Sequence, residues 1–263
     1  MGSISIASLT KRFETGDSSV TALDDITLTV EEKQIVTLVG ASGCGKSTLL
    51  NLIAGFETPT HGRVLVDGRP VKGPGPDRGV VFQQTALFPW LSVEDNIAFG
   101  LSLRANRGKG SREQVVERML QRTGLSAFRQ RKPAELSGGM RQRAAIASVL
   151  AINPSTLLMD EPFGALDSLT RSIMQDFLLE IWEEQRKTVV LVTHDIDEAI
   201  YLADRTVVMT AHPGRICEII DVDLPRPRRY EMRSDAAFIR LRDHVTEIVR
   251  TEAIQGAVAS AIN

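Results

Sequence analysis

Apolar and polar residues alternate strictly near the start of this chain. The alternation in residues 4–9, and again in the second half of residues 23–30, predicts two strands. Residues 14–19 are typical of a turn between them, and Asp67-Gly68 predicts a hairpin turn within residues 61–71. We therefore expect antiparallel strands early in the chain.

Uninterrupted apolar runs predict a second class of strand, buried on both faces. They occupy residues 35–39, 79–82, 155–159, 187–193 and 205–209. Runs of this kind are typical of a parallel sheet that helices cover on both sides. Residues 214–220 alternate again, as an edge strand does. The pattern predicts the α/β fold class.

Between about residues 92 and 153 the apolar spacing becomes helical. Ser92 and Asp95 have the spacing of a capping box, and Ser137 is typical of another helix N-cap. Further helices are expected over residues 112–123, 168–185, 196–203 and 235 to about 253, with a loop at residues 104–111. We predict an all-helical subdomain inserted into an α/β core.

These elements divide the chain into three predicted parts. The core with its antiparallel β subdomain covers residues 1–91 and 154–223, and the helical subdomain covers residues 92–153. A proline- and arginine-rich linker and a final helix follow in residues 224–263. The cluster from Arg226 to Arg233 could serve packing, dimer contact or regulation, and we favour packing.

Composition then limits the classes of partner. Among 263 residues, 31 Lys and Arg stand against 33 Asp and Glu, so no overall positive field favours nucleic acid. The two cysteines, Cys44 and Cys217, are far apart in the sequence, which argues against a structural disulfide. We expect no signal peptide, because no segment has its order, and no apolar run approaches the ~20 residues that span a bilayer. A role at a membrane would then depend on a partner.

The strongest chemical motif directly follows the apolar run at residues 35–39. It consists of Gly40, Ala41, Ser42, Gly43, Cys44, Gly45, Lys46, Ser47 and Thr48. A glycine-rich turn between a strand and a helix points several N–H groups at one anion, and the helix start adds positive partial charge. Lys46 supplies a full charge for the β- and γ-phosphates, and the Ser47 hydroxyl is a ligand for Mg²⁺. The sequence therefore predicts that the chain binds a nucleoside triphosphate.

Other candidate groups stand at the ends of apolar runs. Asp160 is placed to hold Mg²⁺ with Ser47, and Glu161 could act as general base on an attacking water. Gln83 could reach the metal or a water, and His194 could donate to the transferring phosphate. Each of these residues alone is at least as typical of an ordinary turn. Coupling to the phosphate loop, residues 40–48, favours the catalytic interpretation.

A second glycine-rich helix start lies at Ser137, Gly138 and Gly139. An N-cap serine followed by glycines is a second device for binding an anion. Two chains arranged head to tail could each close this segment on the nucleotide that the other chain holds. The sequence therefore favours a symmetric dimer with two ATP molecules at its interface.

Taken together, these motifs make the chain resemble an ABC transporter ATPase, which is a P-loop NTPase. Six motifs in order carry the resemblance: the phosphate loop, Val81-Phe82-Gln83, Leu136-Ser137-Gly138-Gly139, Leu158-Met159-Asp160-Glu161-Pro162, Ala165-Leu166-Asp167 and Thr193-His194-Asp195. The resemblance covers nearly the whole chain.

The resemblance implies nucleotide-binding roles for particular residues. Phe13, which we expect on a short loop just before the turn at residues 14–19, matches the aromatic that stacks on adenine. By its position alone it is equally typical of a residue at the edge of the core. Residues 137–139 match the signature segment that completes the site of the partner chain, and Asp167 matches the residue that crosses the dimer interface. ATP and Mg²⁺ are the implied ligands.

It also implies catalytic and metal-binding roles. Glu161 matches the catalytic base, His194 the switch histidine at the γ-phosphate, and Gln83 the glutamine that senses metal and water. Asp160 and Ser47 match the magnesium ligands, together with Gln83. Two residues depart from the usual pattern: Met140 replaces a common glutamine, and Phe13 replaces the commoner tyrosine. We expect only a modest effect of Met140, since the anion contacts come from Ser137 and backbone N–H groups. Phe13 keeps the stacking face of the tyrosine and loses only its hydroxyl.

Within that superfamily the chain resembles the nitrate, sulfonate and taurine importers, and among these it most resembles the taurine and aliphatic-sulfonate import ATPases. The segments that carry this likeness are residues 52–56, 73–83, 87–90, 160–167 and 224–228. The likeness implies a homodimer of ATPase chains at the cytoplasmic face of the plasma membrane, bound to two permease subunits that an extracytoplasmic solute-binding protein supplies. Residues 87–103 match the surface where the permease docks. Phe88 and Trp90 there fit either a partner groove or ordinary packing.

Two other functions remain to be weighed. A soluble ABC ATPase of translation or DNA repair usually carries tandem nucleotide domains or long coiled-coil insertions, and neither pattern occurs here. A P-loop GTPase would need an Asn-Lys-x-Asp guanine motif, which is absent. We expect an ATP-hydrolysing import subunit, although the sequence does not identify the solute.

Overall fold

The computed structural model describes the chain apart from residues 1, 17, 104–110, 212 and 263, and apart from the side chains of residues 15, 18 and 256–262. The chain folds into two compact units. Unit 1 comprises Met1–Gly75 and Arg186–Asn263, and unit 2 comprises Pro76–Gln185. The predicted loop at residues 104–111 lies almost entirely outside the described residues.

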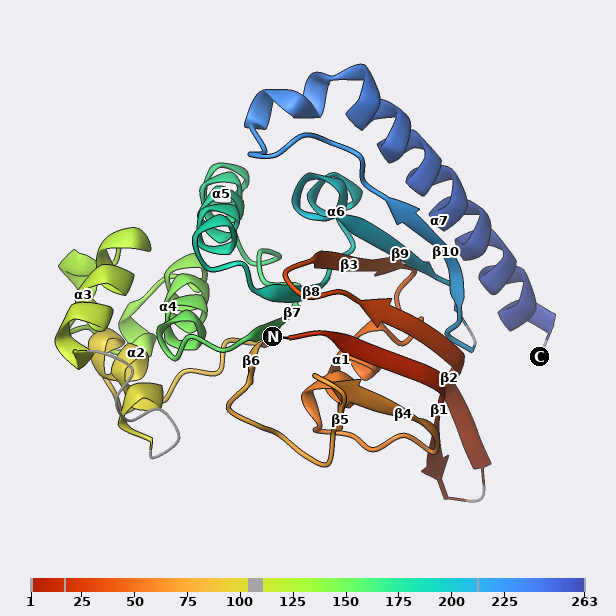
Figure 1. Cartoon of the computed structure of the whole chain (residues 1–263), viewed down its shortest axis with the longest axis horizontal. Coiled ribbons are helices and arrows are strands. Elements are labelled where there is room, and N and C mark those ends of the chain that lie inside the picture. Colours follow the sequence, from red (N-terminus) through yellow and green to blue (C-terminus); the bar gives the residue numbers. More distant parts are fainter. Residues whose placement is uncertain (1, 17, 104–110, 212, 263) are drawn as a thin grey trace. The chain divides into compact units, whose positions relative to one another are not determined.

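Unit 1 contains the strand that leads into the phosphate loop, between two parallel neighbours (Figure 1). The strands, in spatial order, are β10 (Ile216–Asp221), β9 (Arg205–Met209), β3 (Ile35–Gly40) and β8 (Thr188–Val192). Only β10 is antiparallel to its neighbour within this set. β8 is buried along its whole length, and so is β3 up to Val39, as their continuous apolar runs predict.

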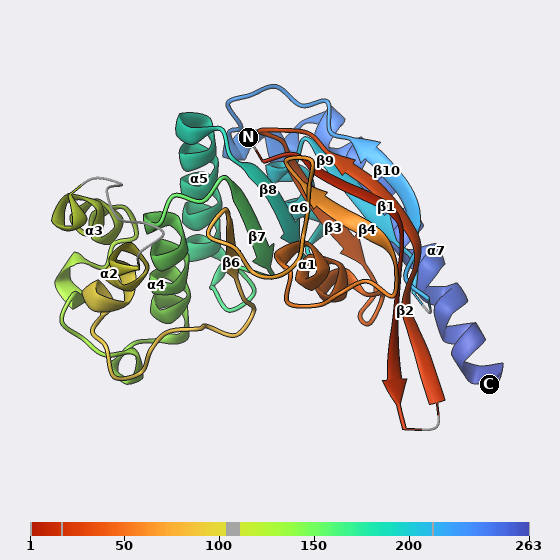
Figure 2. The same cartoon turned by 60° about the horizontal axis from the view of Figure 1, so that its bottom comes forward.

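An antiparallel sheet forms the other layer of unit 1. Its strands, in spatial order, are β2 (Ser18–Val30), β1 (Ile4–Thr15), β4 (His61–Val66) and β5 (Arg69–Pro70). Asp67 and Gly68 both have positive φ, 50° and 71°, which confirms the predicted hairpin turn between β4 and β5. Strands β1 and β2 are longer than predicted, and their hairpin extends beyond the rest of the sheet (Figure 2).

Three helices pack on these strands. α1 (Lys46–Ala54) contacts both β3 and β4, so it lies between the two sheets. α6 (Ile196–Leu202) and the long α7 (Ala236–Ile262) contact β3 and β9 (Figure 1). α7 continues nine residues past the predicted end near residue 253.

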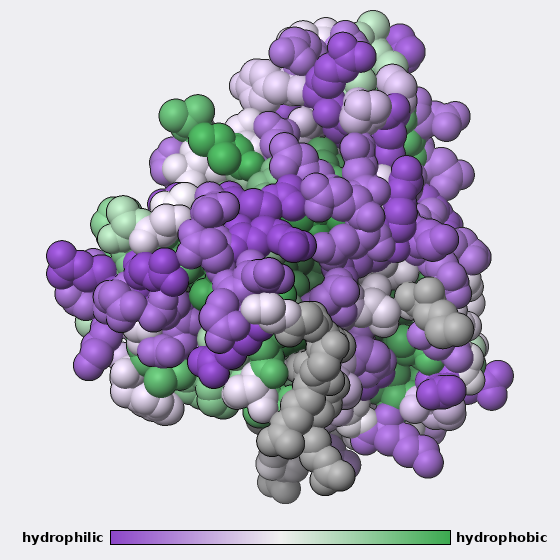
Figure 3. Space-filling view, turned by 60° about the vertical axis from the view of Figure 1, so that its left-hand side comes forward, coloured by the Kyte–Doolittle hydropathy of each residue, from purple (hydrophilic) through white to green (hydrophobic). Residues whose placement is uncertain are grey.

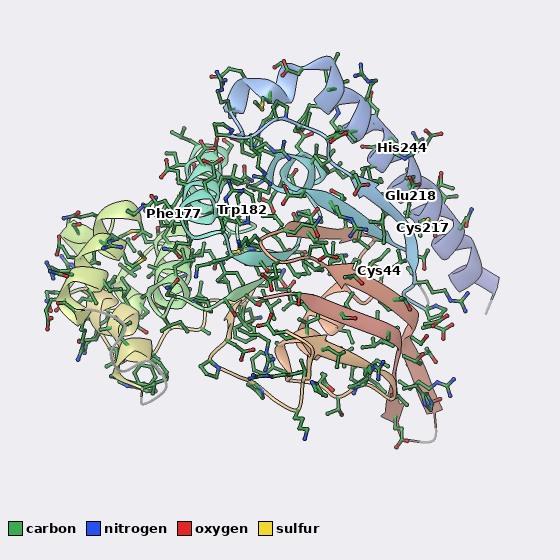
Figure 4. All side chains as sticks on the ribbon, viewed as in Figure 1. Cys44, Phe177, Trp182, Cys217, Glu218 and His244 are labelled. Atoms are coloured by element: carbon green, nitrogen blue, oxygen red, sulfur yellow. The ribbon has the colours of Figure 1, made fainter. Side chains whose placement is uncertain are left out.

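The tail of unit 1 is fixed by packing, as we favoured from the sequence. Arg226 and Arg228 donate to backbone carbonyls of residues 202 and 203, and Arg228 is only 8% exposed. Farther along, His244 of α7 contacts Glu218 of β10 at 2.9 Å (Figure 4). Cys44 is a buried free thiol and Cys217 an exposed one.

Unit 2 combines two parallel strands with helices. The strands are β6 (Arg78–Val81) and β7 (Thr156–Asp160), and the α-helices are α2 (Val93–Ser102), α3 (Arg112–Arg122), α4 (Gly138–Ala151) and α5 (Ser168–Gln185). Short 3-10 helices, η2 (Ser126–Phe128) and η3 (Pro133–Glu135), join α3 to α4. α4 contacts α2, α3 and β6. The face drawn in Figure 3 shows hydrophobic side chains in separate patches among hydrophilic ones.

Helix α5 is tied to α3 by one arginine. Arg122 donates to Glu180 and Glu184, each at 2.9 Å, and its guanidinium lies 5.1 Å from the ring of Phe177, one of two aromatics labelled on α5 in Figure 4.

Unit 2 includes β6, β7 and α5 in addition to the helices expected at residues 92–153. The three-part domain division stays a prediction.

Candidate functional site

The phosphate loop joins β3 to α1 with the backbone geometry that its glycines allow. Gly40, Gly43 and Gly45 all have positive φ, at 152°, 79° and 89°. Gly45 is the N-cap of α1, and no side chain caps the N-terminus of this helix. A helix start without a side-chain cap leaves N–H groups directed at an incoming anion, as the sequence predicts.

Lys46 lies across this loop. Its ammonium donates to the carbonyl oxygens of Gly40 at 2.8 Å and Ala41 at 3.0 Å, and its Nζ lies 3.5 Å from Cys44 Sγ. The side chain is only 8% exposed. A cation held so close to an uncapped helix start adds a full charge to the partial charges of the N–H groups.

Two segments remote in sequence, around Leu23 and Gly214, pack against the phosphate loop. A Cβ at Gly45 would lie 2.6 Å from Leu23 Cδ2, and one at Gly214 would overlap the carbonyl oxygen of Cys44. The Gly214 N–H also donates to the Ala22 carbonyl at 3.0 Å. The sequence pattern placed Gly214 only at the start of an edge strand. Its contact with the phosphate loop depends on tertiary packing that no local signal carries.

Phe13 does not lie on a loop, contrary to the expectation. It is part of β1 and pairs with Val20 of β2, because the hairpin is longer than the alternating segments alone indicate. Its ring is 36% exposed, and the Lys11 ammonium lies 4.7 Å from the ring centroid. A partly exposed ring keeps a face that could stack on a base, and the stacking role stays a prediction.

His194 stands between β8 and α6. The preceding residue, Thr193, is buried and donates its N–H to the Leu38 carbonyl at 3.2 Å, whereas His194 is exposed. Asp195 caps α6 by accepting from the Glu198 N–H at 3.1 Å. The histidine is therefore a surface group between two fixed residues, in the same unit as the phosphate loop.

In unit 2 the structure brings two predicted catalytic residues together. Gln83 Nε2 donates to Glu161 Oε2 at 3.0 Å. Glu161 directly follows β7 and has φ of 44°, in the left-handed region that non-glycine residues rarely adopt. Such backbone strain is often found at functional sites, where the surroundings fix the side chain in one direction.

The signature segment forms the start of α4, as predicted. Ser137 is the N-cap, and its Oγ accepts from the Met140 N–H at 3.3 Å. A hydroxyl that accepts in a cap still carries a proton that it can donate. A Cβ at Gly139 would lie 3.2 Å from Leu166 Cδ2, so a small residue suits this position. The first turn of α4 contains no acidic residue that would repel an anion.

Asp167 has a local role that the sequence analysis did not anticipate. Its carboxylate accepts from the Thr170 N–H at 3.0 Å, at the start of α5. Hydrogen bonds from the Thr170 backbone, and then from its hydroxyl, hold the pKa of the Asp167 carboxyl below its usual range. The signal for this cap was present in the sequence, because an aspartate directly before a helix is a typical N-cap. The predicted contact across a dimer interface remains untested.

Helix α2 carries a polar side chain that was not singled out from the sequence and that fixes the segment between β6 and α2. Asn96 is only 4% exposed, and its amide accepts from the Phe88 N–H at 2.8 Å and donates to the Ser92 carbonyl at 2.9 Å. Phe88 is half-buried against Phe99, with ring centroids 4.4 Å apart, whereas Trp90 is 67% exposed. Phe88 thus takes part in packing, and Trp90 is presented at the surface.

The predicted magnesium ligands are hard oxygen donors, as this ion requires. They are the Ser47 hydroxyl, the Asp160 carboxylate and the Gln83 amide oxygen. Among the described residues no three His, Cys, Asp or Glu side chains converge as a metal cluster. Mg²⁺ bound with a nucleotide takes one or two protein ligands besides phosphates and water.

A cavity of about 810 Å³ lies elsewhere in unit 2. Glu94, Arg112, Glu117, Arg129 and other residues of α2 and α3 line it. None of its lining residues belongs to the predicted site, so this cavity is separate from the nucleotide-binding groups. No helix in the described part of the chain has the length and apolar character needed to cross a bilayer.

Comparison with known proteins gives concordant matches. Residues 23–164 match the family model described as ABC transporter. The nitrate import ATP-binding protein NrtD of Synechococcus elongatus is 46% identical, over 91% of this chain and 88% of the relative. The aliphatic sulfonates import ATP-binding protein SsuB of Bacillus licheniformis is 45% identical, over 95% of each chain. An uncharacterised ABC transporter ATP-binding protein of Methanocaldococcus jannaschii is 49% identical, over 96% of this chain and 93% of the relative.

Solved structures agree with these matches. A dimeric ATP-binding cassette in a post-hydrolysis state with ADP and Pi superposes with a TM-score of 0.75 and 33% identity, over 84% of this chain and all of the other. The structure of cbiO1 from Clostridium perfringens, part of the ABC transporter complex cbiONQ, superposes with a TM-score of 0.72 and 28% identity, over 90% of this chain and 92% of the other. The fold class predicted from the sequence is confirmed.

Proposed function

The chain belongs to the ABC transporter family of ATP-binding proteins, and on that premise we propose that it drives the import of a small anionic or zwitterionic solute. It is an ATPase, with ATP as substrate and Mg²⁺ as metal. The observation that carries the proposal is the uncapped start of α1 with Lys46 held across it, in a chain whose named relatives are import proteins.

ATP binding rests on the phosphate loop. The N–H groups at the start of α1 surround the β-phosphate, and Lys46 pairs with the β- and γ-phosphates. The carbonyl oxygens of Gly40 and Ala41 already hold the Lys46 ammonium, so little side-chain entropy is lost when phosphate binds. Phe13 offers a ring face to adenine. Ser47 and Asp160, with Gln83, would hold Mg²⁺, which neutralises phosphate charge when bound.

Hydrolysis rests on Glu161. Its carboxylate takes a proton from water while the water oxygen bonds to the γ-phosphorus, and the bond from that phosphorus to the bridging oxygen breaks. ADP leaves with the electron pair, and inorganic phosphate forms. The hydrogen bond from Gln83 orients the Glu161 carboxylate in this reaction. His194 donates to a γ-phosphate oxygen as negative charge develops there.

The second half of each site comes from another copy of the chain. The signature segment has the features of an anion site, namely a serine cap whose proton remains available and small residues at positions 138 and 139. The cassette solved with ADP and Pi is dimeric, which supports this assembly. ATP closes the dimer over both nucleotides, and hydrolysis reopens it, so that a membrane partner alternates between two states.

The transport partners are two permease subunits and an extracytoplasmic solute-binding protein, with this chain at the cytoplasmic face of the membrane. The exposed Trp90, beside the packed pair Phe88 and Phe99, provides an apolar contact for a permease. Asn96 fixes the backbone that presents these rings. The candidate solutes are nitrate, taurine and aliphatic sulfonates. Nitrate and aliphatic sulfonates appear in the names of the relatives described above, whereas taurine comes from the sequence resemblance alone.

Solute uptake in whole cells tests this function. Cells lacking the chain are supplied with labelled nitrate, taurine and an alkanesulfonate, and the wild-type chain should restore uptake of at least one solute. Lys46→Ala should not restore it, whereas Lys72→Ala, at an exposed lysine of unit 1, should. Unchanged uptake of all three solutes in cells lacking the chain would overturn the assignment of cargo, and an active Lys46→Ala would overturn the role of ATP.

A further inference from the structure

Three arginines of the tail, Arg226, Arg228 and Arg233, converge on the C-terminal end of α6. Arg226 Nη2 donates to the Leu202 carbonyl at 2.9 Å, and Arg228 Nη2 donates to the Ala203 carbonyl at 2.6 Å. The Arg233 guanidinium lies 4.3 Å from the ring centroid of Tyr201, which is fully buried. These contacts satisfy terminal carbonyls of the helix and place positive charge at its negative end.

The same arginines are themselves fixed. Arg228 also donates to the Leu224 carbonyl and, at 3.2 Å, to the Pro225 carbonyl. Its burial lowers its pKa to about 10, so the guanidinium is still charged at neutral pH. Arg226 pairs with Asp204, whose other oxygen accepts from the Ile35 N–H at 2.8 Å. The tail is therefore connected to the first residue of β3 as well as to α6.

At its other end, α6 begins at Ile196, and its N-cap, Asp195, directly follows His194. The helix has seven residues, a length of roughly 10 Å. Its residues from Glu198 to Leu202 are all buried. The Thr193 N–H bonds to the Leu38 carbonyl, and the Asp204 N–H bonds to the Ile35 carbonyl at 2.8 Å. The segment from Thr193 to Asp204 is thus anchored to β3 at both of its ends.

From this geometry we propose that the tail arginines are positioning residues for His194. They clamp the far end of a short, buried helix, and a rigid helix transmits that constraint to the histidine at its start. The idea rests on the proposed role of His194 in hydrolysis, and none of the three arginines touches the nucleotide. Displacement of a catalytic group by about 1 Å can lower turnover by about a hundredfold without preventing substrate binding.

Kinetics of tail variants in the full chain test the idea. Arg228→Ala and Arg226→Ala should lower kcat by about tenfold to a hundredfold while KM for ATP stays within about twofold. Arg229→Ala, at an exposed arginine of the same segment, should leave both constants unchanged. Arg228→Lys should recover part of kcat, because the ammonium can reach one of the three carbonyls.

Combination with His194→Ala separates positioning from general stability. In the His194→Ala background, Arg228→Ala should cause less than about a twofold further loss, because both changes remove the same contribution. Equal losses of kcat in the two backgrounds would overturn the proposal. If His194→Ala alone keeps full kcat, the proposed role of His194 fails. Hydrogen exchange at the start of α6 then tests separately whether the tail arginines hold the helix in place.

Hydrogen exchange does not depend on catalysis. The amides of Glu198 and Ala199 should exchange at least about tenfold faster in Arg228→Ala than in Arg229→Ala, because their bonds to Asp195 open with the start of α6. Arg226→Ala serves as the second variant if Arg228→Ala does not fold. Unchanged exchange at these amides in a folded variant would contradict the clamp.

Discussion

The two glycine-rich helix starts of this chain look alike in sequence but differ in structure. The start of α1 has no side-chain cap, and Lys46 lies across it with its ammonium on backbone carbonyls. The start of α4 is capped by Ser137, and beside it the Arg141 guanidinium donates to the Leu136 carbonyl at 2.6 Å. The first start therefore offers N–H groups that no side chain caps, together with an ammonium, and the second offers a hydroxyl proton beside a guanidinium.

That difference indicates a division of labour. The phosphate loop can hold a polyphosphate by itself, because its charge and its N–H groups act on the same anion. In our proposal the signature segment adds the Ser137 hydroxyl to a site where the phosphate loop of another chain already holds the phosphates. In our proposal the second segment controls hydrolysis and closure, whereas the first controls affinity.

Glu161→Gln separates binding from hydrolysis most completely. Turnover should fall by about 10²–10⁴-fold, because the amide cannot accept the proton from water, while ATP affinity is retained. The variant should also accumulate as an ATP-bound dimer in which both helix starts engage phosphate. Turnover should be measured by phosphate release and affinity by calorimetry, and unchanged turnover would remove Glu161 as the base.

Lys46→Ala should remove the full positive charge from the start of α1. Loss of the ammonium should weaken ATP binding by about a hundredfold, since a charge-assisted contact to phosphate is removed. Lys72→Ala is the matched control, because it removes the same charge from an exposed site of unit 1. Calorimetric titration with ATP measures the effect, and retained affinity in Lys46→Ala would contradict the division.

Ser137→Ala tests the second helix start. Affinity of the single chain for ATP should be unchanged, whereas kcat should fall by about tenfold, because a hydrogen bond to the charged γ-phosphate is lost. Ser92→Ala is the control, since Ser92 caps α2 in the same unit through the Asp95 N–H. Each substitution should cost about 1 kcal/mol of stability as a lost cap, but only Ser137→Ala should lower kcat.

The smallest predicted effect concerns Asp167. Its folded-state pKa is depressed by bonds to Thr170, so the stabilisation it gives α5 is present above the unfolded pKa of about 3.9. That stabilisation is lost as the pH falls through the lower, folded-state value. Carboxyl chemical shifts recorded between pH 2 and 6 should show Asp167 titrating below a typical aspartate, and an ordinary midpoint would exclude the cap.

Much of the fold could be predicted because its elements are local. Helix α5 and strand β9 have the bounds that their apolar runs indicate, and the Asp67-Gly68 turn follows from two residues that tolerate positive φ. The phosphate loop likewise carries its geometry in its own glycines. Such features need no knowledge of the rest of the chain.

What could not be predicted depends on contacts between distant segments. The turn residues at 14–19 predict a loop at Phe13, but pairing of Phe13 with Val20 continues the strand. Gly214 looked like the start of an edge strand, and only packing brings it against the Cys44 carbonyl. Arg228 belongs to a polar, proline-rich run, yet it is buried because α6 supplies carbonyl partners.

In the proposed mechanism the phosphate loop is half of a site, and we therefore expect the ATPase activity per chain to depend on chain concentration. Turnover per chain should rise steeply as wild-type chain is concentrated, in step with the ATP-dependent dimer measured by sedimentation. Ser137→Ala should bind ATP over the same range without that rise. Constant turnover per chain, from a species that remains monomeric at saturating ATP, would contradict the claim.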